Sequence, residues 1–348
     1  MVDEIKERKK KILKAIIRKH ILSAKPVGSR SLAKSYDFGI SPATIRNEMA
    51  DLEDMGYLKQ PHTSAGRIPS DKGYRFYVDV LMDQSEVSST QLKESLREFY
   101  KEKKGIEGII SGMVNMLSRL TRYTTMISEP ELDKSKIKKV ELIRVARKTL
   151  LIVFITDTGI VNNKIIKLEE DLSQDQLKQI SRYLLKRLQN KTLMDLDDKF
   201  INQIAQDLMK RVNLSQRLFE IINGELNKIG KSTNIRVFLG GTSYILDQPE
   251  FNDINVLKKV LKMLDHEENL RKLVQNLPED DLEVKIGHEN SLDEMKNCSI
   301  VCATYHLGNK AIGKIGVIGP TRMEYPRVIS TVDIAADILG KIISQGND

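Results

Sequence analysis

Residues 41–55, with the sequence SPATIRNEMADLEDM, place small, polar and cationic side chains at the spacing of one helix face. Asn47 and Ala43 lie opposite the apolar positions: an asparagine can bind adenine through two hydrogen bonds, and an alanine methyl can contact the thymine methyl group. The same face becomes acidic at Asp51 and Asp54, which DNA phosphates would repel, so only the N-terminal half of this helix could enter a major groove. The candidate DNA contacts of this helix are Ser41, Ala43, Thr44, Arg46 and Asn47.

The local sequence favours a helix that begins at this point. Ser41 is a suitable N-cap, and Pro42 fits the first helical position, where its missing N–H costs nothing. Ile45, Met49 and Leu52 recur with helical spacing and form a stripe that can be buried. Taken alone, the pattern also fits an ordinary amphipathic helix with a solvated face, so the elements around it have to decide between the two interpretations.

Those neighbouring elements predict a winged helix-turn-helix domain. A first helix covers residues 3–22, and a second short helix starts at Ser29, which can cap it. After the third helix, residues 57–69 form a β-hairpin with its tip at 61–66, and Ser70 caps a further helix. Three helices followed by a hairpin are typical of this DNA-binding fold. Candidate contacts with phosphates or a minor groove lie at the start of the second helix and on the hairpin: Ser29, Arg30, Lys59, His62, Thr63, Ser64 and Arg67.

The net charge of +8 is concentrated in the same part of the chain. Residues 1–75 contain 16 Lys and Arg against 9 Asp and Glu, whereas the remaining residues contain 40 against 39. An excess of positive charge on the segment that holds a candidate recognition helix indicates a polyanionic partner. Double-stranded DNA is the partner that this combination favours.

Two irregular stretches resemble one protein family. The segment VGSRSLAKSYDFGISPATIRNEMADLEDMGYL is similar to the winged-helix domains of bacterial repressors in general. Its continuation, QPHTSAGRIPSDKGYRFYVDVLM, resembles the heat-inducible transcription repressor family HrcA, which regulates chaperone operons. The resemblance returns near the C-terminus in IGKIGVIGPTRMEYPRVI and is diffuse between these two anchors.

This resemblance implies a dimeric repressor that binds an inverted-repeat operator, the CIRCE element, through one winged helix per subunit. It also implies a GAF-like domain interrupted by a dimerising insert. A further implication is that the chaperonin GroEL helps the repressor to reach its active form. When heat produces unfolded clients, the chaperonin is occupied, the amount of active repressor falls and the chaperone operons open.

Beyond residue 90 the pattern predicts strands at 138–144, 149–156 and 163–168, followed by a helical interruption. Further strands, two of them joined by a hairpin turn at 307–310, precede a closing helix that starts near Pro326. A heptad-like spacing between Leu92 and Leu120 predicts one or two helices packed on the body. We therefore predict an α+β multidomain protein in which antiparallel strands build the GAF-like domain. The predicted division is a winged helix at 1–82, a linker at 83–90, the GAF-like domain at 91–171 and 277–348, and a largely helical, dimerising insert at 172–276.

No constellation in the sequence supports catalysis, a metal site or a cofactor. Residues 308–314, GNKAIGK, match the first seven positions of a phosphate-binding P-loop, but Ile315 stands where a Ser or Thr is required. The five histidines show no paired metal-ligand spacing, and no Ser/His/Asp cluster or nucleophile elbow is visible. We expect a protein that is not an enzyme and that holds no cofactor.

Cys298 and Cys302 are four residues apart on a predicted strand, so they share one face but lie too far apart to bridge easily. We expect both to be buried thiols in a reducing cytoplasm. The N-terminus lacks the features of a signal peptide, and no apolar run approaches the ~18–20 residues that span a bilayer. The expected location is cytoplasmic, away from any membrane.

Two other functions fit parts of the sequence. A metabolite-controlled winged-helix repressor would hold a small molecule in its GAF-like domain, although a single sequence does not identify the residues of such a pocket. An enzyme fused to a DNA-binding domain would need catalytic groups, which are missing. A thermal-shift screen of metabolites would separate the first alternative from the chaperonin-dependent repressor, because a true effector raises Tm with concentration.

Overall fold

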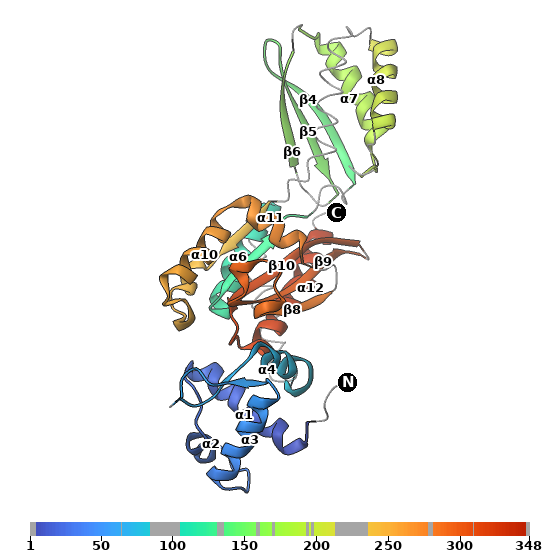
Figure 1. Cartoon of the computed structure of the whole chain (residues 1–348). Coiled ribbons are helices and arrows are strands. Elements are labelled where there is room, and N and C mark those ends of the chain that lie inside the picture. The colour runs from blue at the N-terminus through green and yellow to red at the C-terminus, as the bar shows by residue number, and fades with distance from the viewer. Residues whose placement is uncertain are drawn as a thin grey trace.

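The computed structural model has three units that follow one another along its length, with a central body between an N-terminal unit and a third unit (Figure 1). The structure describes residues 5–63, 65–83, 105–130, 136–157, 161–168, 171–192, 195, 198–212, 236–277, 281–308 and 310–345. It is a mixed α+β protein whose sheets are antiparallel. The predicted linker after Asp83 and the first part of the heptad pattern, up to residue 104, lie outside the described residues.

The N-terminal unit contains the predicted helices and hairpin in the predicted order. Its elements are α1 (Glu7–Ser23), α2 (Ser29–Ser35), α3 (Pro42–Asp54), β1 (Leu58–Lys59), β2 (Ile68–Pro69), α4 (Asp71–Phe76) and a π-helical turn (Tyr77–Leu81). Strands β1 and β2 are antiparallel, and a bridge between Val27 and Arg67 ties the hairpin to the segment before α2. The returning side of the hairpin is therefore hydrogen-bonded on both edges, to β1 and to the segment before α2.

Helix α3 is built as its sequence predicts. The Ser41 hydroxyl accepts a hydrogen bond from the Thr44 amide at 3.1 Å, and Pro42 occupies the first helical position. Ile45 and Leu52 are completely buried. The predicted cap of α2 is wrong, because Gly28 is the N-cap and Ser29 is the first helical residue.

Helix α3 also buries a carboxylate that the apolar pattern did not reveal. Glu48 is 5% exposed and pairs with Arg8 and Lys9 of α1, with 2.9 Å between Lys9 Nζ and Glu48 Oε2. The Lys9 ammonium also lies 2.9 Å from Asp51. Burial opposes ionisation of Glu48, but the two cations outweigh it and lower the pKa of this carboxyl. The lysine-rich side of α1 thus neutralises part of the acidic end of α3.

The buried ring of His20 predicts a pH-dependent stability. Its Nδ1 lies 2.7 Å from the Tyr74 hydroxyl, and burial lowers its pKa from 6.5 to about 4. Between these two pKa values the imidazole is protonated in the unfolded chain but neutral in the folded one. The contribution of His20 to the free energy of unfolding is therefore complete above pH 6.5 and is lost as the pH falls towards 4. We expect about 2 kcal/mol to be lost between about pH 7 and pH 5. Thermal unfolding of His20→Gln should show a shallower pH dependence than the unmodified chain; equal slopes would contradict this assignment.

The central body is a five-stranded antiparallel sheet in the order β7-β3-β10-β9-β8. The bounds are β3 (Thr124–Ser128), β7 (Val237–Gly240), β8 (Leu282–Ile286), β9 (Cys298–Leu307) and β10 (Lys310–Pro320). The long β9–β10 hairpin forms the centre of the sheet, and its turn joins Leu307 to Lys310 as predicted. Short 3₁₀ turns lie at Thr242–Ile245, Pro249–Phe251, Gly287–Glu289 and Asp293–Met295.

Helices cover both faces of this sheet. The covering helices are α6 (Ile106–Thr121) and α12 (Tyr325–Gln345) on one face, and α10 (Ile254–Asp265) and α11 (Glu267–Gln275) on the other. Strand β9 alternates between the two cores, because Val301 packs towards α12 whereas Cys298 and Cys302 pack towards α10 and α11. Both thiols are free and buried, as predicted, and burial raises the pKa of each to about 12.

The third unit is a separate three-stranded sheet with two helices on one face. Its elements are β4 (Ile137–Ala146), β5 (Thr149–Thr156), β6 (Val161–Lys167), α7 (Gln174–Leu188) and α8 (Asp198–Val212). The three strands agree closely with the predicted ones, and α7 begins with a capping box formed by Ser173 and Gln176. Apolar residues of α7 and α8 form one cluster with one face of the sheet.

The strand pairing groups these segments differently from the domain limits predicted from the sequence. Residues 137–167, expected in the GAF-like domain, form the sheet of the third unit. Conversely, β7 and the helices α10 and α11, expected in the insert, belong to the body: β7 pairs with β3, and the two helices cover the sheet. The reason is that all these strands show similar apolar patterns, so the sequence does not reveal that β4, β5 and β6 pair with one another while β7 pairs with β3, more than 100 residues away.

Among the described residues, no helix is long and apolar enough to cross a membrane.

Candidate nucleic-acid interface

The N-terminal half of α3 presents the predicted face to solvent. Ala43, Arg46 and Asn47 are exposed, and Thr44 is half-buried. Ser41, by contrast, uses its hydroxyl to cap the helix, with a contact of 3.1 Å to the Thr44 amide. The side chains suited to base edges are therefore the accessible ones, and the cap holds the first turn that presents them.

A cleft brings the predicted contacts of three elements together. It is lined by the start of α2, one side of α3 and the hairpin, namely Gly28, Ser29, Arg30, Arg46, Met49, Gln60, Thr63, Ala65, Gly66 and Arg67. Lys59 and His62 are exposed on the hairpin outside this lining. Ser64 lies outside the described residues. The cleft thus places hydroxyl, amide and guanidinium groups side by side, which is the donor set used on phosphates and sugars.

Gln60 fixes the hairpin tip, a role that we did not infer from the sequence. Its side-chain amide donates to the carbonyl oxygens of Thr63 at 2.9 Å and Ala65 at 3.0 Å. Gly66 lies against Val27, where an added Cβ would come within 2.4 Å of the Val27 carbonyl oxygen. The available signal was an amide side chain directly before a polar tip, a pattern typical of side-chain hydrogen bonds within a turn.

Arg67 is engaged by a carboxylate of α3. Its Nε lies 2.7 Å from Glu53 Oε2, and its side chain is 21% exposed. A phosphate that binds Arg67 must therefore compete with Glu53. This pair was not predicted, because 13 residues of turn and hairpin separate the two side chains in sequence.

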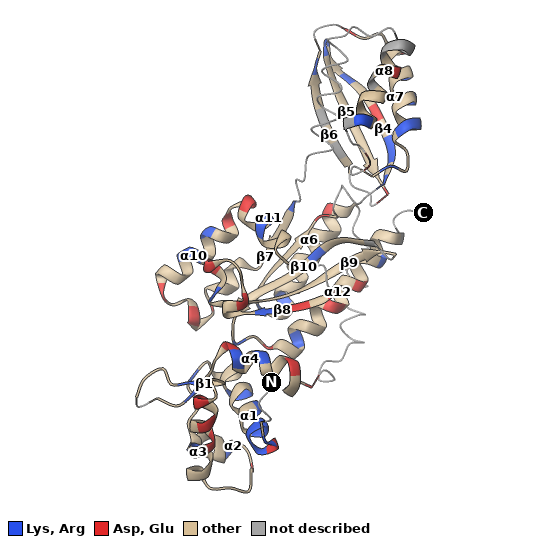
Figure 2. Cartoon of the chain, turned by 45° about the vertical axis from the view of Figure 1, so that its right-hand side comes forward, with Lys and Arg blue, Asp and Glu red and all other residues tan. Residues whose placement is uncertain are grey.

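The charges of the N-terminal unit restrict how DNA could approach. Figure 2 shows acidic segments on α3 and basic segments on α1. Of the acidic residues on α3, Asp51 is compensated by Lys9, whereas Asp54 is exposed. A polyanion would meet the least repulsion at the N-terminal end of α3, where the cleft opens.

The P-loop-like stretch has a structural role. Its residues 310–314 form the start of β10, and the buried Lys314 ammonium donates to the carbonyl oxygens of Val274 in α11, at 3.1 Å, and of Leu277 just beyond α11. A cation at this position stabilises a helix C-terminus. In the described part of the chain, no group of three or more His, Cys, Asp or Glu side chains is placed to hold a metal ion.

Comparison with known proteins places the chain among bacterial regulators. Residues 107–329 match the family model described as HrcA protein C terminal domain. The chain is 39% identical over 341 residues to the heat-inducible transcription repressor HrcA of Moorella thermoacetica, covering 97% of this chain and 98% of that protein. It is 42% identical over 326 residues to the protein of the same name from Natranaerobius thermophilus, covering 93% of each chain.

One solved structure supports the fold alone. A crystal structure described as that of a hypothetical protein, at 24% identity, covers 98% of this chain and 99% of its own with a TM-score of 0.64.

Proposed function

Because the chain belongs to the HrcA family of heat-inducible transcription repressors, we propose that its N-terminal unit is a winged helix that reads one half of an inverted-repeat operator. The chain is accordingly a transcription repressor and not an enzyme. The observation that supports this proposal best is the cleft at which α2, α3 and the hairpin converge beside the exposed Arg46 and Asn47. In this arrangement α3 enters the major groove by its N-terminal half, while α2 and the hairpin hold phosphates.

The operator that we propose is the CIRCE inverted repeat in front of chaperone operons. The test measures binding of the full chain to the repeat from the organism's own chaperonin promoter and to a scrambled duplex of equal composition. A specific reader should prefer the operator by at least about 10³-fold at physiological salt. Equal affinities for the two duplexes would refute sequence-specific repression through this site.

Arg67 and Glu53 give a test of the hairpin contact. Removing the competing carboxylate with Glu53→Gln should strengthen binding to all DNAs, because Arg67 is then released for a phosphate. Arg67→Ala should weaken binding to all DNAs alike and reduce the slope of log Kd against log salt by about one unit. Salt titrations of both variants on operator and scrambled DNA measure this. An unchanged slope in Arg67→Ala would show that the hairpin does not contact phosphates.

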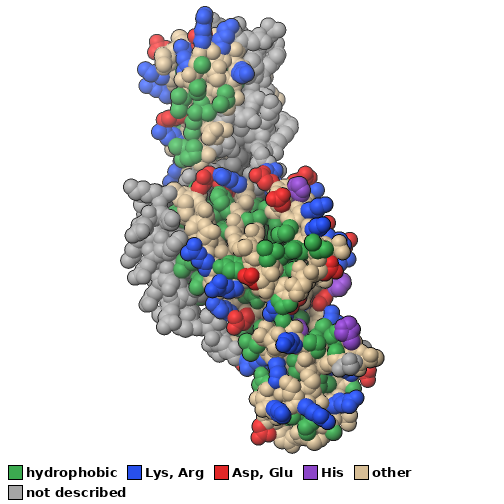
Figure 3. All heavy atoms as spheres, turned by 90° about the vertical axis from the view of Figure 1, so that its left-hand side faces the viewer, with side chains coloured by type: hydrophobic (Ala, Val, Ile, Leu, Met, Phe, Trp, Pro, Cys, Tyr) green, Lys and Arg blue, Asp and Glu red, His purple; other side chains and the backbone are tan. Residues whose placement is uncertain are grey.

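We further propose that two chains associate through the open face of the β4–β5–β6 sheet. Helices α7 and α8 cover one face, whereas Ile143, Val145, Val161 and Ile165 are 44–60% exposed on the other. Ile143 and Ile165 both pair with Leu151, so the three form one apolar row across the strands. Figure 3 shows hydrophobic side chains gathered on this unit beside Lys and Arg side chains. An apolar sheet face of this kind fits a second copy of the same surface.

The same observations modify the proposed domain limits. We propose that the GAF-like domain consists of residues 105–130 and 236–345, which share the five-stranded sheet and its covering helices. The dimerising insert then covers residues 136–212 and the undescribed residues up to 235. In this division the insert contributes strands as well as helices to the dimer.

The topology of the body gives a physical reason for dependence on a chaperonin such as GroEL. Strand β3 pairs with β7, more than 100 residues later, and with β10, about 190 residues later. Non-local pairing of this kind folds slowly and leaves apolar strands exposed meanwhile. We propose that the repressor is a folding client of the chaperonin and that the folded chain needs no stable complex with it.

A refolding time course tests this client relationship. After dilution from denaturant, chaperonin with ATP should raise the fraction of chains that bind operator, as measured by titration with operator DNA. The Kd of chains that are already folded should stay the same. A lower Kd for native, monodisperse repressor in the presence of chaperonin would instead indicate a direct allosteric complex.

A further inference from the structure

The two sequence stretches that carry the family resemblance meet in space. The first forms β2 and α4 of the N-terminal unit, and the second forms the end of β10 and the start of α12 in the body. The rings of Tyr74 and Tyr325 lie 6.0 Å apart across this contact. Arg322 donates to the Ile21 carbonyl oxygen at 3.1 Å and to Gln248 at 3.0 Å, so it reaches from the body to the end of α1.

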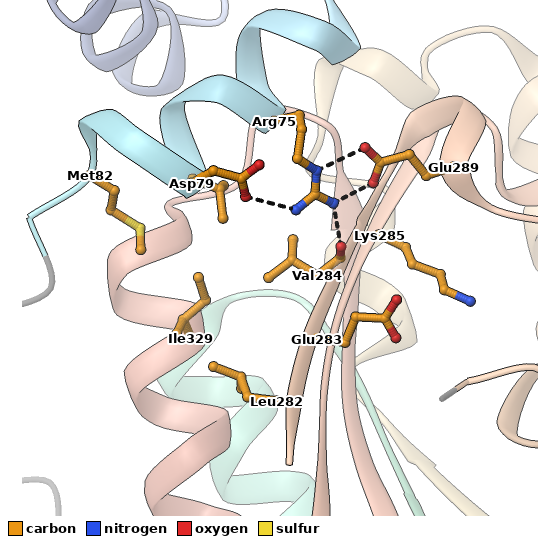
Figure 4. A pocket seen from close by; sticks show the side chains of 10 residues that line it. Arg75, Asp79, Met82, Leu282, Glu283, Val284, Lys285, Glu289 and Ile329 are labelled. Atoms are coloured by element: carbon orange, nitrogen blue, oxygen red, sulfur yellow. Dashed lines mark hydrogen bonds and ion pairs between the residues drawn. The ribbon is translucent and has the colours of Figure 1, made fainter. Parts of the chain in front are cut away.

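A bidentate ion pair lies beside this aromatic contact (Figure 4). Arg75 Nε donates to Glu289 Oε1 at 2.9 Å, and Nη2 donates to Glu289 Oε2 and to the Val284 carbonyl oxygen. Nη1 lies 3.2 Å from Asp79 on the next turn, which keeps the guanidinium plane in position. A bidentate pair of hydrogen bonds fixes the relative orientation of the guanidinium and carboxylate groups as well as the distance between them.

The neighbouring contact leaves no room for a side chain at position 287 while Asp71 keeps its place. Asp71 Oδ2 accepts hydrogen bonds from the His288 amide at 3.1 Å and from His288 Nδ1 at 2.7 Å. Gly287 has a φ of +55°, and an added Cβ would lie 2.1 Å from this carboxylate oxygen. The surface of the body is therefore shaped to receive α4.

We propose that these contacts set the operator spacing that the repressor accepts. Resting on the proposed function, the inference is that Arg75 and Glu289 are positioning residues: they hold each winged helix at a fixed angle on its body. Neither touches the cleft that faces DNA, and the Arg75 side chain is 30% and the Glu289 side chain 37% exposed. An ion pair with this degree of exposure contributes little to the free energy of folding. Its loss should therefore change the orientation of the winged helix on the body.

Operator spacing reports this orientation directly. Each base pair inserted between the half-sites rotates one of them by about 35° and moves it by about 3.4 Å relative to the other. A dimer whose two winged helices are held rigidly then binds one half-site and loses the avidity that the second half-site adds. A dimer whose winged helices can reorient on their bodies can still bind the displaced half-site.

The experiment measures the Kd of the full chain for the natural operator, for operators with one and two added base pairs, and for a single half-site. The variants are Arg75→Glu, Glu289→Arg and the two together. Glu268→Lys, which breaks the exposed 3.0 Å pair with Lys272 on α11, is the matched control. The unmodified chain and the control should lose at least about 100-fold on the two-base-pair insertion.

Each single variant should lose less than about 10-fold on that insertion with unchanged half-site affinity, and the double variant should return towards the unmodified profile. Single variants that keep the unmodified spacing profile would overturn the inference. If a charge reversal abolishes half-site binding, Asp71→Asn, which keeps the side-chain shape, takes its place. The same loss of affinity on the two-base-pair insertion is then compared with that of the unmodified chain. Failure of the proposed function looks different, because the unmodified chain would then bind the natural operator no better than a half-site.

Discussion

Replacing Ile143 with glutamate should lower operator affinity by about 10²–10⁴-fold and convert the protein to monomers. Ile143 is 44% exposed at the β4 end of the apolar row on the open face of the β4–β5–β6 sheet. A carboxylate there would be buried against the apolar face of the second copy, where its charge could be neither solvated nor paired. Once the subunits separate, the second half-site no longer adds avidity.

Analytical ultracentrifugation together with operator titration measures both effects. Leu246→Glu is a matched control, because Leu246 is an apolar residue with 60% exposure that belongs to the body and not to the third unit. The control should remain dimeric with unchanged affinity. A dimeric Ile143→Glu chain that still binds operator tightly would show that the subunits meet elsewhere.

Asn47→Ala should cost roughly 1–3 kcal/mol on the operator and much less on scrambled DNA. The exposed amide of Asn47 is the side chain of α3 best suited to a bidentate contact with adenine. Because the lost bonds are to a base edge, the ratio of specific to non-specific affinity should fall while the salt slope stays the same. Asn255→Ala, an exposed asparagine on α10, is the control. Equal losses on both DNAs would remove Asn47 from the residues that read sequence.

Local sequence signals were sufficient for the N-terminal unit. The Ser41 cap, the proline after it and the stripe of Ile45 and Leu52 act within a few residues, and the structure confirms each of them. The hairpin was equally visible, because turn residues separate two short apolar segments. Elements set by neighbours in sequence are predictable from one chain, and the β9–β10 hairpin of the body belongs to the same class.

The assignment of strands to sheets was not predictable in this way. The segments that became β5 and β7 are both apolar, yet β5 pairs with β4 and β6 whereas β7 pairs with β3, more than 100 residues away. Which strand pairs with which depends on the packing of whole units, and a single sequence does not report that packing.

For the candidate site, the sequence predicted which side chains of α3 are exposed but not how the charged side chains pair. Sequence placed Arg46 and Asn47 on the outward face, where the structure also has them. It did not show that Glu53 holds Arg67, nor that Glu48 is buried against Arg8, because each of these pairs joins segments well separated in sequence. Such pairs decide which cations are available to a phosphate, so they change the expected effects of substitution.

An iron-chelate cleavage reagent attached to a new cysteine at the N-terminal end of α3 tests whether this helix reads the operator. Ala43→Cys offers an exposed thiol there, while Cys298 and Cys302 are buried with pKa values raised to about 12 and should not react. If one α3 lies in the major groove of each half-site, the operator should be cut in two clusters related by its central dyad. A single cluster, or cutting without relation to the dyad, would contradict a two-fold repressor that reads its operator through this helix.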